Sequence, residues 1–170
     1  MKEYPIIFSG PMVCAILDGR KTVTRRLLTR AWDAACRAYR TDELRLWVRE
    51  MFRESVDPGP QWIYAADYGD EGRHLEGMPR WRPSIHMSRL ASRITLDVMS
   101  MRKERLQDIS EEDATAEGVE TDPEHLPAAS YYLTRRRDFR ILWNSLYRKP
   151  GTTWADNPEV YRIEFRVLEP

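Results

Sequence analysis

A basic segment near the N-terminus carries an amine, a hydroxyl and several guanidinium groups within a few residues. Lys21 has arginines on both sides, and like charges close by favour its neutral form, which can take a proton from a hydroxyl. Thr24 carries such a hydroxyl, and it needs a base before it becomes a nucleophile. If Lys21 occupies a turn and Thr24 starts a strand, both side chains can point into one cleft, whereas within one regular strand they would face opposite ways. A run of this kind at the start of a strand is also typical of a solvated surface.

A second candidate for proton transfer is Glu117. The pattern from Ser110 to Asp113 is typical of a capping box with acids in the first turn, and Gly118 supplies a stop, so a short helix is predicted over residues 111–117. A carboxyl group at a helix C-terminus meets the negative end of the helix dipole, which favours its protonated form. A protonated acid can donate to a departing amine. Alternatively, Glu117 only ends the helix and pairs with a nearby arginine.

The apolar patterns elsewhere predict several strands and one long helix. Strands are predicted over residues 22–28, 44–52, 62–65, 93–101 and 160–167, and helices from Pro11 to a stop at Gly19 and over residues 132–147. Between them, residues 57–60, 68–82 and 122–130 have compositions typical of loops. Several strands with short helices between them, without a regular β-α-β order, indicate an α+β fold with a curled or barrel-like sheet.

The basic segment also carries a family resemblance. Residues 19–26, Gly-Arg-Lys-Thr-Val-Thr-Arg-Arg, resemble the Gly-x-Lys-x-x-Thr-x-Arg motif of ASCH domains, which belong to the PUA-like superfamily. The resemblance covers nearly the whole chain in the order of its elements. It implies a single PUA-like domain over residues 1–170, built as a curled β-sheet or β-barrel with flanking helices. Residues 46–50, 83–87 and 106–110 resemble the larger ASCH proteins of bacteriophages and prophages, which implies a phage origin and the cytoplasm of a bacterial host cell.

Within this family, small bacterial amidohydrolases remove the acetyl group from N4-acetylcytidine with a lysine, a threonine and a glutamate. These residues fall on Lys21, Thr24 and, in the stretch Ala-Thr-Ala-Glu, on Glu117. The resemblance implies that Lys21 accepts a proton, Thr24 is the nucleophile and Glu117 is the proton donor. The chain carries extra segments near residues 54–83 and 120–134 that the small enzymes lack. The substrate expected is therefore an N4-acylated cytidine or a related modified nucleoside, in a cleft that the extra segments can reshape.

The alternative function is a PUA-like module that binds, and possibly cleaves, RNA. The strip from Arg20 to Arg30 contains no acid, and Trp81 lies between two arginines in a predicted loop, a composition that stacks single-stranded bases. His86 is either a hydrogen-bonded loop histidine or a ligand-binding residue. The candidate contacts to substrate or to single-stranded RNA are Arg20, Arg25, Arg26, Trp81 and His86.

Composition limits the remaining classes of function. Lys plus Arg number 27 and Asp plus Glu number 27, so the net charge does not attract the whole molecule to nucleic acid or to a membrane surface. Cys14 and Cys36 do not make a metal quartet, and no second histidine or cysteine lies at ligand spacing, so we expect no metal and no cofactor. No apolar run reaches the length that crosses a bilayer, so we expect no membrane partner. The sequence does not indicate an oligomeric state.

Overall fold

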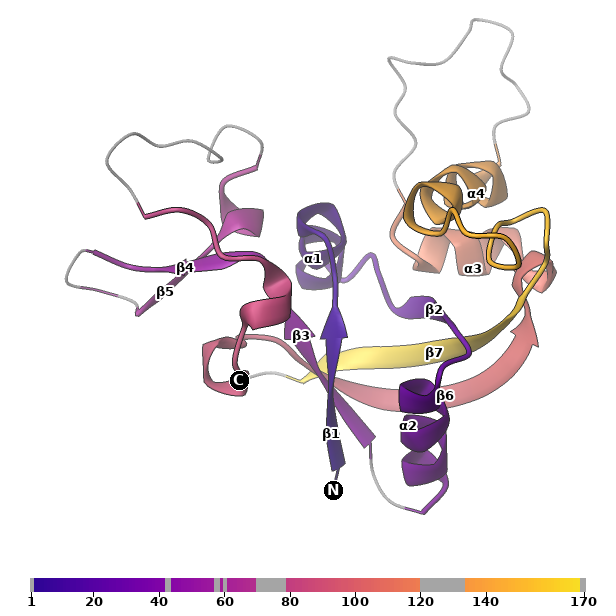
Figure 1. Cartoon of the computed structure of the whole chain (residues 1–170), viewed down its shortest axis with the longest axis horizontal. Helices are drawn as coiled ribbons and strands as arrows, with labels where there is room; N and C mark the ends of the chain where they lie inside the picture. The colour runs from indigo at the N-terminus through magenta and orange to yellow at the C-terminus, as the bar shows by residue number, and fades with distance from the viewer. Residues whose placement is uncertain are drawn as a thin grey trace, which may run out of the picture.

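The fold combines a mixed β-sheet, a small hairpin and four α-helices (Figure 1). The computed structural model describes residues 2–41, 44–56, 59, 61–69, 79–119 and 134–168. Its strands and helices are, in chain order, β1 (Lys2–Ile7), α1 (Gly10–Leu17), β2 (Val23–Leu27), α2 (Arg30–Thr41), β3 (Leu44–Arg49), β4 (Phe52–Glu54), β5 (Trp62–Tyr64), β6 (Thr95–Arg105), α3 (Glu111–Ala116), α4 (Arg135–Leu146) and β7 (Glu159–Leu168), with 3-10 turns that include η1 (Ala65–Asp67) and η3 (Ser84–His86). The predicted α+β class is confirmed.

The main sheet is open. Its strand order is β1-β3-β6-β7-β2, with β1 parallel to β3 and the other neighbours antiparallel. Among the described residues, β1 pairs only with β3 and β2 only with β7, so the two edge strands do not meet. The expectation of a curled or barrel-like sheet is therefore wrong. Alternating apolar residues predict that a segment is a strand, but they do not specify which strands pair, and pairing decides whether a sheet closes.

The main core lies between this sheet and the helices α1 and α2. On β3, Leu44, Leu46 and Val48 are buried while the intervening side chains are partly exposed, which is the alternation expected of a strand with one face in the core. Helix α2 was not predicted. It packs Trp32 and Cys36 against this core, and its Asp33 accepts a hydrogen bond from the Tyr161 hydroxyl on β7.

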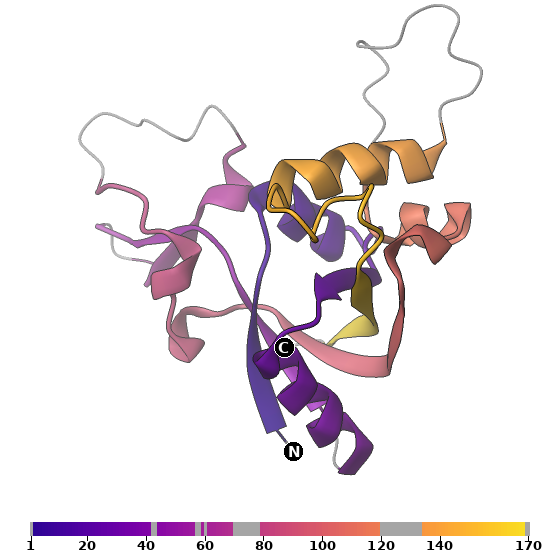
Figure 2. The ribbon, with the colours of Figure 1, turned by 45° about the vertical axis from the view of Figure 1, so that its right-hand side comes forward.

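A second core joins α3, α4 and one end of the sheet (Figure 1 and Figure 2). Phe139 and Trp143 of α4 pack there against Ala114 of α3, and Val160 of β7 completes the contact. The Ser110 hydroxyl accepts a hydrogen bond from the Asp113 amide, so the predicted start of α3 is confirmed. Helix α4 begins three residues later than predicted, and residues 132 and 133 lie outside the described residues.

The β4–β5 hairpin lies on the opposite side of α1 from α3 (Figure 1). The strand predicted over residues 44–52 is divided, because Glu50 is buried between β3 and β4 and accepts hydrogen bonds from Arg93. Of the predicted extra segments, residues 57, 58, 60, 70–78 and 120–133 lie outside the described residues. No helix in the described part of the chain is long and apolar enough to span a membrane.

Candidate functional site

The backbone brings Lys21 against the end of α3 before β2 begins. Gly19 takes a positive φ of 73°, which turns the chain after α1, and the Lys21 amide then donates to the Ala15 carbonyl at 2.9 Å. Lys21 forms an isolated antiparallel bridge with Glu117. The next amide, that of Thr22, donates to the Ala116 carbonyl at 2.9 Å. Lys21 therefore lies in the connection before the strand, as predicted, although it is 96 residues from Glu117 in the sequence.

Gly118 makes this approach possible. Its φ is +74°, a conformation that residues with a side chain rarely adopt. A Cβ at this position would lie 2.8 Å from the Cβ of Lys21 and 2.9 Å from the Cβ of Ala15. The predicted helix stop is thus also a point of close packing between α3 and the segment that carries Lys21.

The Lys21 side chain is held by three oxygens in the protein interior. Its Nζ donates to Glu117 Oε2 at 2.7 Å, to the Glu117 carbonyl at 2.8 Å and to the Val23 carbonyl at 2.8 Å. Only 2% of Lys21 is exposed. Burial lowers the pKa of this amine; the Glu117 carboxylate opposes the shift, and Arg26 and Arg25 add to it. The sequence predicted a lowered pKa from the neighbouring arginines, but desolvation is the larger cause.

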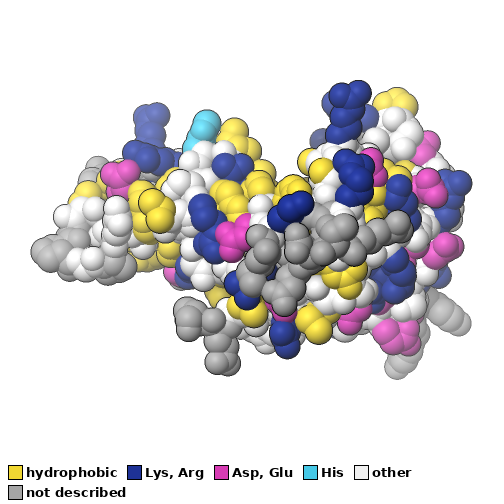
Figure 3. Space-filling view, turned by 90° about the horizontal axis from the view of Figure 1, so that it is seen from below, with side chains coloured by type: hydrophobic (Ala, Val, Ile, Leu, Met, Phe, Trp, Pro, Cys, Tyr) yellow, Lys and Arg dark blue, Asp and Glu magenta, His cyan; other side chains and the backbone are white. Residues whose placement is uncertain are grey.

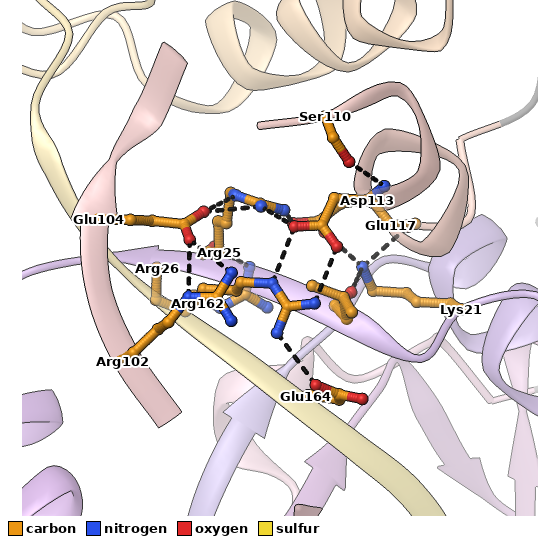
Figure 4. Close-up of polar contacts among 11 residues, drawn as sticks. Lys21, Arg25, Arg26, Arg102, Glu104, Ser110, Asp113, Glu117, Arg162 and Glu164 are labelled. Atoms are coloured by element: carbon orange, nitrogen blue, oxygen red, sulfur yellow. Dashed lines mark hydrogen bonds and ion pairs between the residues drawn. The ribbon is translucent and has the colours of Figure 1, made fainter. Parts of the chain in front are cut away.

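Arg25 lies inside the protein and links Glu117 to further carboxylates (Figure 4). Its Nη1 donates to Glu117 Oε1 at 3.2 Å, its Nε to Glu104 at 2.8 Å and its Nη2 to Asp113 at 2.6 Å. Arg162 of β7 donates to both oxygens of Asp113, each at 2.8 Å. Hydrogen bonds from Arg162 and from Arg25 hold the pKa of the Asp113 carboxyl well below its usual range, although burial opposes them.

This network was missed at the level of sequence. Glu104 and Asp113 are 79 and 88 residues from Arg25, so no local spacing connects them. The one available signal was Asp113 in the first turn of the predicted helix, where it was interpreted only as a favourable charge near the helix N-terminus. Its carboxylate instead neutralises two arginines behind the candidate site.

Thr24 lies on β2 opposite Ile163 of β7, and 1% of it is exposed. It lines one cavity together with Lys21 and Glu117. The cavity is also lined by Phe8, by Met12 and by residues at α4, which are Phe139, Leu142, Trp143 and Leu146 of the helix and Tyr147 directly after it. The cavity has only about 30 Å³ of space that can hold the centre of a water molecule. It is therefore narrow, with polar groups on β2 and α3 and an apolar wall on α4.

The remaining predicted contact residues are distributed differently. Arg26 lines the cavity, donates to the Ile7 carbonyl at 2.8 Å and lies over the Phe8 ring at 4.9 Å. Arg20 is exposed and pairs with Asp18 at 2.8 Å. Trp81 and His86 do not line the cavity: they precede and end η3 near the β4–β5 hairpin, and His86 is exposed.

Comparison of the chain with protein-family models, with curated proteins and with solved structures gives no match. Among the described residues, no group of three or more His, Cys, Asp or Glu side chains is arranged to hold a metal ion. A buried amine in contact with a carboxylate can move a proton to and from a reacting group, and a threonine lines the same cavity.

Proposed function

We propose that the protein is an amidohydrolase that acts on an N4-acylated cytidine or a related modified nucleoside, with Thr24 as nucleophile, Lys21 as base and Glu117 as acid. The observation that carries the proposal is the convergence of these three side chains on one cavity, with Lys21 Nζ 2.7 Å from Glu117 Oε2. The motif resemblance to ASCH domains supports the same assignment, but no family match does. A phage origin and a cytoplasmic location in the host remain predictions of that resemblance.

The proposed reaction begins at the amide carbonyl. The Thr24 oxygen forms a bond to this carbon while the neutral Lys21 amine takes the hydroxyl proton. Glu117, which is protonated when the Lys21 amine is neutral, delivers its proton to N4 as the bond between N4 and the carbonyl carbon breaks. The proton on Nζ then passes along the contact to Glu117 Oε2, which restores the pair. Water then attacks the acylated Thr24, and the products are the free nucleoside amine and a carboxylic acid.

The surroundings of the pair suit this proton transfer. The Lys21–Glu117 pair has the same total charge whether it is an ion pair or a neutral amine beside a neutral acid. A proton can therefore move between the two groups without changing the buried charge. Burial lowers the pKa of the Lys21 amine, and Arg25 Nη1 donates to Glu117 Oε1 at 3.2 Å. The sequence-based argument from the helix dipole alone did not include Arg25.

The narrow cavity has a consequence for substrate entry. Ligand pockets typically enclose about 300–1,000 Å³, whereas this cavity has only about 30 Å³ of space for the centre of a water molecule. A pyrimidine ring enters only if side chains of α4 move. Leu146, which is 59% exposed at the end of α4, is the wall residue best placed to do so. The apolar wall suits the acyl group, and the polar wall suits the amide.

An RNA-binding function is less well supported by the arrangement of the basic strip. Arg25 is buried in ion pairs, Arg26 is partly buried against Phe8, and Arg20 pairs with Asp18. On the face shown in Figure 3, positive and negative side chains are interspersed with hydrophobic ones. If RNA binding were the function, affinity should fall steeply with added salt, because phosphate contacts release counterions.

The test is incubation of purified protein with N4-acetylcytidine, with cytidine release followed by chromatography. Lys21→Met is the comparison, because methionine keeps an unbranched side chain as far as the lysine Cε position and removes the amine that acts as base. We expect release by the wild type and loss of release in the variant. Absence of release from folded wild-type protein, together with salt-dependent binding of single-stranded RNA, would replace the proposal by the RNA-binding alternative.

A further inference from the structure

Arg53, on the β4–β5 hairpin, differs from the other buried charged residues. Its exposed fraction is 3%. Every other charged side chain buried in the described part of the chain has an oppositely charged partner; these are Lys21, Arg25, Glu50, Glu117 and Arg162. No carboxylate of the described residues pairs with Arg53. Because an arginine side chain does not lose its proton in proteins, this charge cannot be relieved by neutralisation.

The hydrogen bonds of Arg53 leave one edge of its guanidinium group without an acceptor among the described residues. Nη1 donates to the Pro79 carbonyl at a long 3.4 Å. Nε is buried without an acceptor, and within the described ranges Nη2 has none either. Nε and Nη2 form the side-on edge that binds the two oxygens of a carboxylate or phosphate in parallel. A buried donor without a partner is costly, so this edge calls for an acceptor.

The surroundings of Arg53 orient this edge and leave the local charge positive. Trp81 covers one face of the guanidinium group at 4.3 Å from the ring centroid, and Tyr68 lies 6.1 Å from Trp81. Glu54, the next residue on β4, points to the other face of the strand and pairs with Arg82 at 3.1 Å. The acid closest in sequence is therefore engaged elsewhere, while Arg53 is held in a fixed plane.

We propose that Arg53 is the centre of an oxyanion-binding site on the β4–β5 hairpin, in which the Nε and Nη2 edge binds two oxygens of a phosphate or carboxylate group. The site is separate from the Lys21 cavity and does not depend on the proposed amidohydrolase activity. Trp81, interpreted from sequence as a stacking platform for bases, lies against the guanidinium group of Arg53.

The test is the thermal unfolding of the full chain titrated with sodium phosphate or with sodium acetate, in chloride at constant ionic strength. We expect the midpoint to rise to a plateau with at least one of the two anions, and the effective anion identifies the source of the oxygens. Salts that are excluded from the protein surface also stabilise the fold, but this stabilisation rises with salt concentration without reaching a plateau. If the unfolding midpoint of the wild type reaches no plateau with either anion, the proposal is overturned.

Variants distinguish anion binding at Arg53 from anion binding at other cationic side chains. Arg82→Gln removes an exposed arginine whose backbone bridges to Phe52 of β4, and it should keep the plateau, as should Lys21→Met. Arg53→Met should lose it and, without the anion, should unfold at a midpoint no lower than that of the wild type, because it removes an unpaired buried charge. If Arg53→Met does not fold, tryptophan fluorescence gives a second measurement. Anion binding should change the fluorescence of the wild type up to a plateau, and this change should be absent in Trp81→Phe. A plateau that persists in Arg53→Met, or a fluorescence change that persists in Trp81→Phe, would contradict the assignment.

Discussion

The Lys21 Nζ contacts Glu117 twice, at 2.7 Å from the carboxylate Oε2 and at 2.8 Å from the backbone carbonyl of the same residue. Each side chain is at most 4% exposed. The carbonyl helps to fix where the amine lies, and in the proposed mechanism the carboxylate exchanges a proton with it. This double contact is the basis of the proposed chemistry, and it depends on the end of α3 reaching the turn before β2.

Replacing Glu117 by glutamine should abolish catalysis and weaken the fold. Lys21 and Arg25 would lose a shared buried carboxylate, and breaking a buried ion pair costs about 3–5 kcal/mol. Loss of the acid should lower turnover by about 10²–10⁴-fold. Urea unfolding and cytidine release measure the two effects. Glu112→Gln, an exposed neighbour on α3, is the matched control and should change neither. Wild-type turnover in folded Glu117→Gln would exclude the acid role.

The lowered pKa of Lys21 predicts a pH dependence of stability. In the unfolded chain the amine has its ordinary pKa of 10.5, and in the folded protein the value is lower. Between the two values the unfolded state binds more protons, so the free energy of unfolding rises with pH in this window. Measured against Lys21→Met, wild-type stability should increase as pH rises from the lowered pKa toward 10.5. A difference that stays flat or falls with pH would show that the amine is not destabilised by burial.

Asp113 should contribute stability that disappears in acid. Its pKa is lowered in the folded protein, so the contribution is complete above the ordinary value of 3.8 and is lost as pH falls through the lowered value. Since the side chain is 19% exposed, we expect Asp113→Asn to cost about 1–3 kcal/mol at neutral pH, between exposed and buried ion pairs. Urea unfolding across a pH series should show the two proteins converging below pH 3.8. Asp18→Asn, at an exposed pair, should behave as the wild type throughout.

Gly118→Ala tests the close approach of α3 to Lys21. The new Cβ would meet the Cβ of Lys21 at 2.8 Å, in addition to the strain of a positive φ. Gly151→Ala is the control, because its φ is +81° and nothing lies within 4 Å of the added Cβ. The control should lose about 1–2 kcal/mol from backbone strain alone. Gly118→Ala should lose more and should also lose turnover; equal losses in both variants would mean that the packing at Gly118 does not position Lys21.

Local patterns in the sequence predicted most elements of the fold correctly. The alternation on β3 and β7 and the capping box of α3 each depend on residues within a few positions of one another, which is why they are visible in sequence. Helix α2 was missed, although Trp32, Cys36 and Tyr39 recur at helical spacing, because no element was assigned to residues 30–41. The open sheet could not be predicted, because the pairing of β1 with β3 and of β2 with β7 joins distant segments.

The residues of the candidate site also divide into those that short motifs predict and those that depend on contacts between distant segments. Lys21, Thr24 and Glu117 were selected from short motifs, and the structure brings them to one cavity. Arg25 was expected at a surface, because its neighbours in sequence are basic and polar. Its burial depends on Glu104, Asp113 and Glu117, which come from other elements and whose combined charge could be recognised only once the fold was known.

The measurement that tests the central claim most directly is cytidine release from N4-acetylcytidine by four proteins: wild type, Thr24→Val, Thr24→Ser and Thr22→Val. Valine at position 24 keeps the branched shape of threonine and removes only the hydroxyl, serine keeps a hydroxyl, and Thr22 is an exposed threonine of the same segment. The account predicts release by the wild type, Thr22→Val and, at a reduced rate, Thr24→Ser, with none by folded Thr24→Val. Release by Thr24→Val at the wild-type rate would contradict it.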